Sequence, residues 1–403
     1  MSTTIKINST NYVGKVANIV FYPHDGSPSI NLGNHMLPYE YEFANDYYYG
    51  EYRLTFSSPK TYVCTLTAFP PPPFSIVNSV TSTTLAGMLS TDGEFDANGT
   101  TATFSKLMGG LAINPIDSSL YLGERSSTSH RIRKIDMAGN VTTFISTPST
   151  GLSALLPYSL SFDSAGMLYV STWVASVVKI DLSGTLTQFV GTSYNCGYTN
   201  ANGTAAQFGG IISVSNNLND IVFIGDVHNN VIRTVDSAGN VNLFAGSPNI
   251  AGNVNNTVLT SQFSTPLGMV FDTHNNIYVT DGSCIKKITT TGTVFTLAGN
   301  QTTSGFADGL GLAARFGNNY LNLAVDDNDN IYVSDWQNNA VRMITPIGEV
   351  KTIAGAGPTN GGFQDGVGAS NIRFNGPTSI CYYQNALYVS DSLNNLIRKL
   401  DLS

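Results

Sequence analysis

The sequence predicts an all-β protein, a six-bladed β-propeller preceded by a small β domain. Six couplets of an aromatic and an aliphatic residue recur after position 80, at intervals of 48 to 56 residues. Repeats of this length are typical of propellers and solenoids, in which each unit buries its core by stacking on its neighbours. The couplets are Tyr121-Leu122, Tyr169-Val170, Phe223-Ile224, Tyr278-Val279, Tyr332-Val333 and Tyr388-Val389.

Each repeat contains four β-prone stretches, which is the number of antiparallel strands in a propeller blade. In the fifth unit they are residues 321–325, 330–334, 340–345 and 349–354. The segments between them are rich in the Asp, Asn and Gly residues that tight turns require. Six units therefore predict six blades of short strands joined by polar turns.

The two ends of the repeat region predict how the ring closes. Residues 80–87 match the fourth strands of units four and five, 294–299 and 350–355, although they precede the first complete unit. The last unit stops at its third strand, residues 396–400. We therefore expect strand 80–86 to complete the sixth blade by strand exchange, a velcro closure that removes free sheet edges.

A proline run divides the chain into two domains. Residues 69–75 contain four consecutive prolines, which favour a stiff polyproline II linker of about 12 Å. Residues 76–403 hold the propeller, and residues 1–68 predict a small β-sandwich or barrel that acts as a docking domain. Its β-prone runs alternate with period two, at 4–8, 16–22, 52–56 and 61–67.

Tyrosine is concentrated in this first domain. Six tyrosines fall within residues 39–52, and Tyr47, Tyr48 and Tyr49 are consecutive. They could fill the core of a small domain, with their hydroxyls at its rim. The alternative is a docking face, because tyrosine is enriched where proteins meet.

Composition and charge limit the partners. The net charge is −8, with 19 basic and 27 acidic residues, so general nucleic-acid binding is disfavoured. We see neither a secretory signal nor a membrane-spanning stretch. The four cysteines are far apart and show no metal-ligand spacing. We expect synthesis in a reducing cytoplasm, with no metal and no cofactor.

An acid at the end of the second strand and a base in the third strand recur together in five of the six units. Unit two has Thr172 and Val178 instead and so loses both at once. Joint loss favours a structural ion pair across adjacent strands over a catalytic acid. The pairs are Glu124 with Arg133, Asp226 with Arg233, Asp281 with Lys286, Asp335 with Arg342 and Asp391 with Arg398.

The segments that cross from one blade to the next carry two further patterns. Asp-Gly dipeptides begin at Asp92, Asp308 and Asp365. A phenylalanine precedes five of the inner strands, and a buried Phe wedge with a glycine-dependent turn explains both patterns without chemistry. These phenylalanines are Phe104, Phe208, Phe263, Phe316 and Phe374.

Four segments of unit five resemble the NHL-repeat family of β-propellers: residues 307–316, 330–335, 338–342 and 350–355. The resemblance covers residues 80–403 and implies a six-bladed propeller. Unit two departs from it, with Thr172 in the place of the usual Asp. The first domain has a loose resemblance to the short β modules that begin virion proteins of phages and large DNA viruses.

The sequence offers no catalytic constellation. His130 and His228 lie in turns between second and third strands, whereas His274 lies at the opposite end, so the three cannot converge on a metal. The segments at the channel mouth carry no carboxylates, in contrast to metal-dependent lactonases of related six-bladed fold. The Asp-rich turn 326–330 lacks the Gly and distal Glu of a calcium loop, which favours a capped turn.

The candidate binding residues are those in which the units differ. Trp173 and Trp336 occupy the same turn position in units two and five, and His228 lies in the corresponding turn of unit three. Exposed aromatic rings on this face could stack on sugars or anchor a protein. The alternative is that both tryptophans pack against a neighbouring long loop.

These observations favour a non-enzymatic structural or binding protein, a virion or cell-surface component that docks through its first domain. Its propeller would present a face to a protein partner or to glycans, with no nucleic acid bound and no membrane insertion. A propeller enzyme of the lyase, lactonase or hydrolase kind and an intracellular scaffold are the alternatives. An intracellular scaffold would stay in the cytoplasm.

Overall fold

The computed structural model describes six strands between residues 3 and 65 as backbone only. It also describes residues 80–402, apart from 108, 127–128, 149–154 and 319–320. The expected linker 69–75 and Tyr47, Tyr48 and Tyr49 lie outside the described residues. The chain divides into two compact units, and the boundary along the sequence lies between Ile76 and Val77.

The first unit is built from antiparallel strands in two sheets. Strand β1 (Thr3–Ile7) pairs with β4 (Tyr39–Phe43). In the second sheet, β2 (Val16–Pro23) lies between β3 (Ile30–Met36) and β5 (Gly50–Phe56), and β6 (Thr61–Thr65) pairs with β5. The expected β-prone runs are thus strands.

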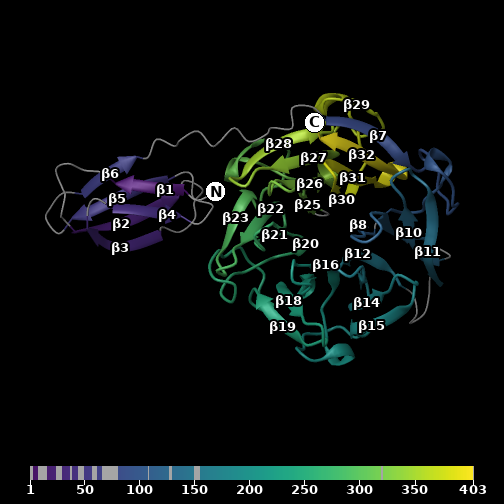
Figure 1. Cartoon of the computed structure of the whole chain (residues 1–403), viewed down its shortest axis with the longest axis horizontal. Coiled ribbons are helices and arrows are strands. Elements are labelled where there is room, and N and C mark those ends of the chain that lie inside the picture. Colours follow the sequence, from purple (N-terminus) through teal and green to yellow (C-terminus); the bar gives the residue numbers. More distant parts are fainter. Residues whose placement is uncertain are drawn as a thin grey trace. The chain divides into compact units, whose positions relative to one another are not determined.

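The second unit is a six-bladed propeller, and each blade contains a four-stranded antiparallel sheet (Figure 1). The all-β fold predicted from the repeat is confirmed. The strands of blades 1 to 3 are β8 (Leu111–Ile113), β9 (Leu120–Arg125), β10 (Ser129–Ile135), β11 (Val141–Pro148), β12 (Pro157–Phe162), β13 (Leu168–Thr172), β14 (Ser176–Ile180), β15 (Leu186–Gly191), β16 (Ile211–Asn216), β17 (Val222–Asp226), β18 (Val231–Val235) and β19 (Val241–Ala245).

Blades 4 to 6 repeat this order, with two short extra strands, β24 and β29, at the outer edges of blades 5 and 6. The strands are β20 (Pro266–Phe271), β21 (Ile277–Asp281), β22 (Cys284–Ile288), β23 (Val294–Gly299), β24 (Gly309–Leu310), β25 (Leu321–Val325), β26 (Ile331–Asp335), β27 (Ala340–Ile344), β28 (Glu349–Ala354), β29 (Gly366–Val367), β30 (Pro377–Tyr383), β31 (Ala386–Asp391) and β32 (Leu396–Leu402).

The ring closes by the expected strand exchange. Strand β7 (Val80–Ala86) pairs antiparallel with β32, the third strand of blade 6. The register runs from Val80 opposite Leu402 to Ala86 opposite Ile397. Because β7 supplies the fourth strand, blade 6 contains both the first and the last strand of the propeller.

The aromatic residue of each couplet fills the interface between its own blade and the next. Tyr332 of blade 5, for example, is fully buried in a core cluster with Leu387 and Val389 of blade 6. Tyr388 of blade 6 packs in turn with Phe104 and Leu122. The couplet therefore recurs because each blade needs one large ring against its neighbour.

In blades 2, 4 and 5, aspartates close the turns between first and second strands. In blade 5, Oδ1 of Asp326 accepts hydrogen bonds from the backbone N–H groups of Asn328 and Asn330 at 2.9 Å. Its Oδ2 accepts the hydroxyl of Tyr332 at 2.9 Å, so the cap also orients the couplet. The helices that the structure describes are three-residue 3-10 turns. None of them has the length and apolar character of a membrane span.

Candidate functional site

Five blades contain a buried ion pair between their second and third strands. In blade 5, Arg342 lies opposite Val333 and Asp335 lies opposite Ala340, so acid and base meet diagonally on one face. The side chains are 0–1% exposed. The nitrogen–oxygen distances are 3.0 Å for Arg133 with Glu124, Arg233 with Asp226, Lys286 with Asp281 and Arg398 with Asp391, and 3.1 Å for Arg342 with Asp335.

Each arginine of these pairs also holds the loop that leads into its blade. Nη2 of Arg342 donates to Oδ1 of Asp308 and to the carbonyl of Ala307, both at 2.7 Å. Its Nη1 donates to the carbonyl of Arg315 at 3.0 Å. One buried cation therefore fastens the loop to the sheet. The equivalent loop partners are Asp96 for Arg133, Asn200 for Arg233 and Asp365 for Arg398.

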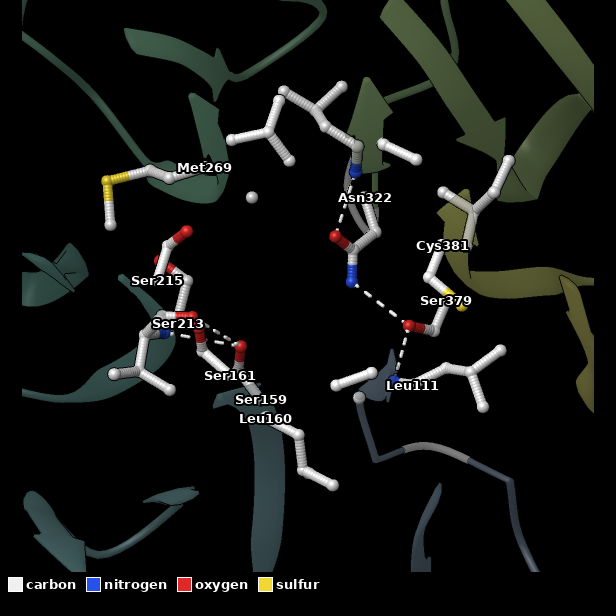
Figure 2. Close-up of a pocket in the computed structure, with 18 of the residues that line it drawn as sticks. Leu111, Ser159, Leu160, Ser161, Ser213, Ser215, Met269, Asn322, Ser379 and Cys381 are labelled. Atoms are coloured by element: carbon white, nitrogen blue, oxygen red, sulfur yellow. Dashed lines mark hydrogen bonds between the residues drawn. The ribbon is translucent and has the colours of Figure 1, made fainter. Parts of the chain in front are cut away.

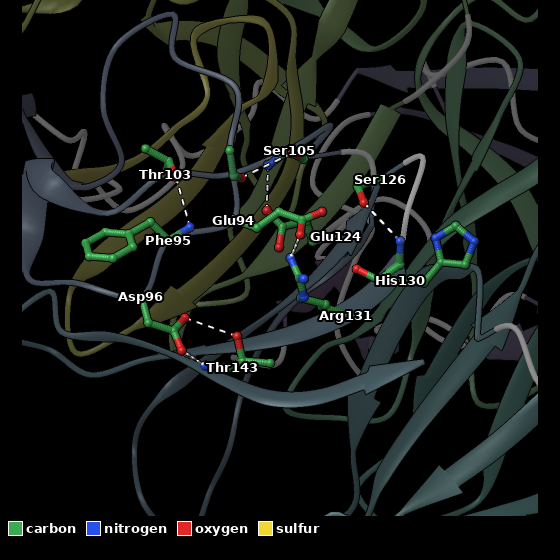
Figure 3. A network of polar contacts seen from close by, with 12 residues as sticks. Glu94, Phe95, Asp96, Thr103, Ser105, Glu124, Ser126, His130, Arg131 and Thr143 are labelled. Carbon is green, nitrogen blue, oxygen red and sulfur yellow. Dashed lines mark hydrogen bonds and ion pairs between the residues drawn. The ribbon is translucent and has the colours of Figure 1, made fainter. Parts of the chain in front are cut away.

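The loop carboxylate that contacts Arg133 in blade 1 is Asp96, whereas Asp92 of the Asp-Gly dipeptide has another contact. Asp96 accepts from Arg133 at 2.7 Å. It also accepts from the backbone N–H of Thr143 at 2.9 Å (Figure 3). Asp92 instead forms a single β-bridge with Phe104. The informative signal is an Asp or Asn eight residues before the loop phenylalanine, as in Asp96, Asn200 and Asp308, or nine residues before it, as in Asp365.

The loop phenylalanines stack on the same cations. Phe316 lies 5.2 Å from the guanidinium carbon of Arg342, and Phe306 lies 5.0 Å from it. Aromatic faces attract cations, and the attraction is stronger away from water. The Phe wedge and the ion pair therefore form one buried unit. The other pairs are Phe104 with Arg133, Phe208 with Arg233, Phe263 with Lys286 and Phe374 with Arg398.

Burial dominates the ionisation of the paired acids. It raises the pKa of Glu124, Asp226 and Asp335, and raises the pKa of Asp391 to about 6, although the neighbouring arginines act in the opposite direction. Burial also acts to raise the pKa of Asp365, but hydrogen bonds and the adjacent guanidinium outweigh it and lower that pKa. These shifts have a structural cause.

Blade 2 has a different arrangement at this position. The hydroxyl of Thr172 lies 3.1 Å from the carbonyl of Ser176, and the amide of Gln188 donates to the carbonyl of Gly191 at 2.9 Å. The connection into blade 2 spans only 149–156, whereas that into blade 3 spans 192–210. The short connection contains no acid and no phenylalanine. It therefore cannot place these side chains over the second-to-third-strand hairpin, as the loops of the other blades do.

The six inner strands line a central channel with a cavity volume of about 540 Å³. Its polar groups are hydroxyls and amides: Oγ of Ser379 accepts from the N–H of Leu111 at 2.8 Å and from Nδ2 of Asn322 at 3.3 Å (Figure 2). Within the described residues, no Asp, Glu, His, Lys or Arg lines it. The described lining therefore offers neither a carboxylate nor an imidazole for metal or acid–base chemistry.

A second hollow, of about 330 Å³, lies at the loop end of the propeller, where second strands turn into third strands. We call it the Trp173 pocket. Tyr158 lines both this pocket and the channel, so the two hollows adjoin there. The pocket residues come from blades 1 and 2 and the loops before them: Lys106, Arg125, Ser126, His130, Leu156, Tyr158 and Trp173.

Two aromatic rings and a guanidinium shape this pocket. Trp173 is 52% exposed, and its ring centroid lies 5.2 Å from that of Tyr158, with the planes inclined at 40°. The guanidinium of Arg125 lies 5.3 Å from the Tyr158 centroid and 5.7 Å from that of Trp173. Lys106 and Leu156 have positive φ angles of 42° and 41°, a conformation that is uncommon outside glycine. Such backbone strain clusters at functional sites.

The other candidate residues lie elsewhere. Trp336 is half-buried beside Gly376, where an added Cβ would approach its Nε1 to 2.7 Å. His228 is exposed, and its Nδ1 lies 3.0 Å from the carbonyl of Gly209. Neither residue lines the Trp173 pocket. The sequence did not single out Arg125, which holds the same turn position in blade 1 as Trp173 in blade 2.

Asp272, His274 and Asp329 form a group with metal-ligand chemistry, and their oxygen and nitrogen atoms lie within 4.8 Å of one another. His274 contacts Asp329 at 3.1 Å. Asp272 accepts hydrogen bonds from Asn276 and Tyr278, as Asp326 does in the next blade. Asp272 caps its own turn, and Asp329 accepts the N–H of Thr273 in that turn at 2.9 Å, so the group has a structural explanation.

No protein-family model and no curated protein matches the sequence, so membership of the NHL family stays a prediction. The chain is similar in fold to a protein of unknown function from Bacteroides thetaiotaomicron, with 19% identity, a TM-score of 0.61 and coverage of 100% of this chain and 94% of that chain. An auxiliary nutrient binding protein from Bacteroides ovatus has 18% identity, a TM-score of 0.61 and coverage of 99% and 94%.

A gluconolactonase from Xanthomonas campestris has 10% identity and a TM-score of 0.52, with coverage of 80% of this chain and 89% of that chain. At these identities the comparisons establish the propeller fold and leave function to the site itself. The fold occurs both in binding proteins and in enzymes.

Proposed function

We propose that this chain is a non-enzymatic binding protein whose Trp173 pocket holds carbohydrate. The observation that carries the proposal is the exposed ring of Trp173 beside Tyr158, in a concave site next to the channel. Sugars present apolar C–H faces that stack on such rings, while their hydroxyls need hydrogen-bond partners. Ser126 and Arg125 supply polar groups in the same lining.

The position of the pocket supports this function. Five blades bury their second-to-third-strand ion pair under a long loop, and blade 2 alone has a short connection. The described channel lining has no charged group for catalysis. A binding role also agrees with the fold shared with an auxiliary nutrient binding protein.

Glycan binding by the full chain tests the proposal. We expect the wild-type protein to bind a subset of immobilised oligosaccharides and Trp173→Ala to lose about five- to thirtyfold in affinity, since aromatic contacts are worth about 1–2 kcal/mol. Trp336→Ala is the matched control, because Trp336 has the same turn position outside the pocket. Equal binding by wild type and Trp173→Ala would contradict the proposal.

The location of the protein is a separate proposal. Exposure on a virion or cell surface, with the first domain docked to another surface protein, agrees with the low content of charged residues, 11%. Copurification of the full chain with particles tests it, and deletion of residues 1–74 should abolish that copurification. Recovery of the protein only from the soluble cell fraction would favour the scaffold alternative.

A further inference from the structure

The central channel adjoins the Trp173 pocket, so a ligand longer than one ring can enter both hollows. Tyr158 lines each of them, and its ring centroid lies 5.2 Å from that of Trp173. The channel is the larger hollow, with about 540 Å³ against about 330 Å³ for the pocket. Both volumes are within the usual range of ligand sites. The two hollows together therefore offer room for more than one sugar residue.

The wall of the channel consists of sheet edges. Each innermost strand, such as β16, has a partner strand on one side only, so alternate backbone N–H and C=O groups point into the channel. Neighbouring blades satisfy part of this edge: Oγ of Ser159 accepts the N–H of Val214 at 3.2 Å, and Oγ of Ser161 accepts the N–H of Asn216 at 3.0 Å. These bridges between blades 2 and 3 hold a polar wall in place.

Two side chains on different sides of the cavity, Asn322 of blade 5 and Ser215 of blade 3, keep hydrogen-bonding capacity for an occupant (Figure 2). Both are partly exposed. The amide nitrogen of Asn322 donates to Oγ of Ser379 at 3.3 Å, which uses one of its two N–H groups. Among the described residues, the hydroxyl of Ser215 has no hydrogen-bond partner. Asn322 has the strand position that Ser159 has in blade 2, next to Tyr158, so it lies at the level of the pocket.

The channel suits an uncharged ligand. No Asp, Glu, His, Lys or Arg is among the described lining residues, so a charged group would lose its water there without gaining a partner of opposite charge. Hydroxyl groups both donate and accept, and they match a wall of amides, hydroxyls and backbone groups. Ile113, Phe162 and Val270 also line the channel and can contact the apolar C–H face of a sugar.

Building on the proposed carbohydrate-binding function, we infer that the ligand is a neutral oligosaccharide of two or more residues that occupies both hollows. One residue stacks on Trp173, and the next passes Tyr158 into the channel, with its hydroxyls toward Asn322 and Ser215. The Trp173 pocket alone binds a single sugar weakly, and the channel supplies the remaining affinity and the selection for length.

Calorimetry with ligands of increasing length tests this inference. The probes are neutral mono-, di- and trisaccharides of glucose, galactose, mannose and N-acetylglucosamine, titrated into the full chain. We expect at least one series to gain about tenfold or more in affinity from the monosaccharide to the disaccharide, because the second residue adds hydrogen bonds in the channel. The same disaccharide with C6 oxidised to a carboxylate in both residues should lose this gain.

Variants show whether the channel is occupied. Asn322→Ser and Ser215→Val introduce residues that other blades have at the equivalent positions, Ser159 and Val270, so the fold should be retained. Each variant should lower the affinity for the disaccharide about five- to tenfold and leave the affinity for the monosaccharide unchanged. Thr142→Ala, which changes an exposed residue of the outer strand β11, is the control and should change neither affinity.

The outcomes separate this inference from the proposed function. A disaccharide that binds no more tightly than the monosaccharide, or that binds both channel variants as it binds wild type, would overturn the extended ligand. The carbohydrate site would be retained if Trp173→Ala still lost binding. Tighter binding of the oxidised disaccharide would overturn the neutral class of ligand. Absence of binding of every probe to wild type would overturn both proposals.

Discussion

The hydroxyl of Ser82, in the first strand of the propeller, accepts a hydrogen bond at 2.7 Å from the guanidinium of Arg398, which lies 316 residues later. Ser82 also donates to Oδ1 of Asp365 at 2.6 Å, and Thr84 donates to Oδ2 at 2.8 Å. Asp365 in turn pairs with Arg398. The buried ion-pair unit of blade 6 therefore joins the two ends of the ring.

Removal of strand β7 should open the ring. A chain lacking residues 1–86 leaves the backbone groups of β32 unpaired and removes Ser82 and Thr84 from Asp365, so we expect a large fall in melting temperature and association into oligomers. A chain lacking residues 1–79, which keeps β7, is the control. Equal melting temperatures and equal elution in size-exclusion chromatography would show that β7 does not close the ring.

The buried pair of blade 5 should not tolerate charge reversal. Asp335→Arg and Arg342→Asp should each lower the free energy of unfolding by about 3–5 kcal/mol, since each leaves a buried charge unpaired. The double reversal should not recover this loss, because a carboxylate at 342 would face Asp308 and two backbone carbonyls.

Urea unfolding measures the free energy of unfolding of the two single variants and of the double variant. Reversal of the pair between Glu349 and Lys351, which is partly exposed at 3.3 Å, is the control and should change the free energy of unfolding by less than about 0.5 kcal/mol. Recovery of stability in the double reversal at 335 and 342 would mean that the loop contacts contribute little.

Asp391 should make stability depend on pH. Its pKa of about 6 in the folded protein is above the usual 3.8, so the folded state binds a proton more tightly than the unfolded state. The contribution of Asp391 to the free energy of unfolding is therefore complete below about pH 4 and falls as the pH rises to 6. Relative to Asp391→Asn, wild type should lose on the order of 1–3 kcal/mol of unfolding free energy across this window. Urea titrations at pH 4, 5, 6 and 7 measure it, and a constant difference would contradict the shift.

The two tryptophans should differ in accessibility. The chain has only these two, so Trp173→Phe and Trp336→Phe each leave a single fluorophore. Acrylamide should quench the remaining Trp173 more strongly than the remaining Trp336, because Trp173 is 52% exposed whereas Trp336 is half-buried beside Gly376. Similar quenching constants in the two variants would contradict the assigned environments.

Much of the propeller could be predicted from the sequence because its strands follow a local period. The couplets gave the blade number, residues 80–86 gave the closure, and the joint change to Thr172 and Val178 indicated the ion pairs. All of these depend on alternation along strands or on pairing between adjacent strands, which short-range patterns report. The role of Tyr47, Tyr48 and Tyr49 of the first domain, in a core or in a docking face, stays a prediction.

The crossing loops and the pocket could not be predicted in this way. Asp96 was not singled out because the Asp-Gly pattern points to Asp92, whereas the folded loop places Asp96 beside Arg133 and Asp92 beside Phe104. Arg125 was missed because in blade 1 it is simply the residue that follows a buried acid. Its partner Trp173 belongs to the next blade, and no pattern along one blade reports that contact.

The sequence by itself determined a closed all-β ring of six blades, with the acid and base positions that tie the second-to-third-strand hairpins of five blades. The tertiary structure decided which of the residues that differ between blades come together in one pocket. The packing of blade 1 against blade 2 brings Lys106, Arg125, Tyr158 and Trp173 into one pocket. Strand pairing is local and periodic, whereas a pocket between blades depends on the length of a single connection and on the side chains of two different units.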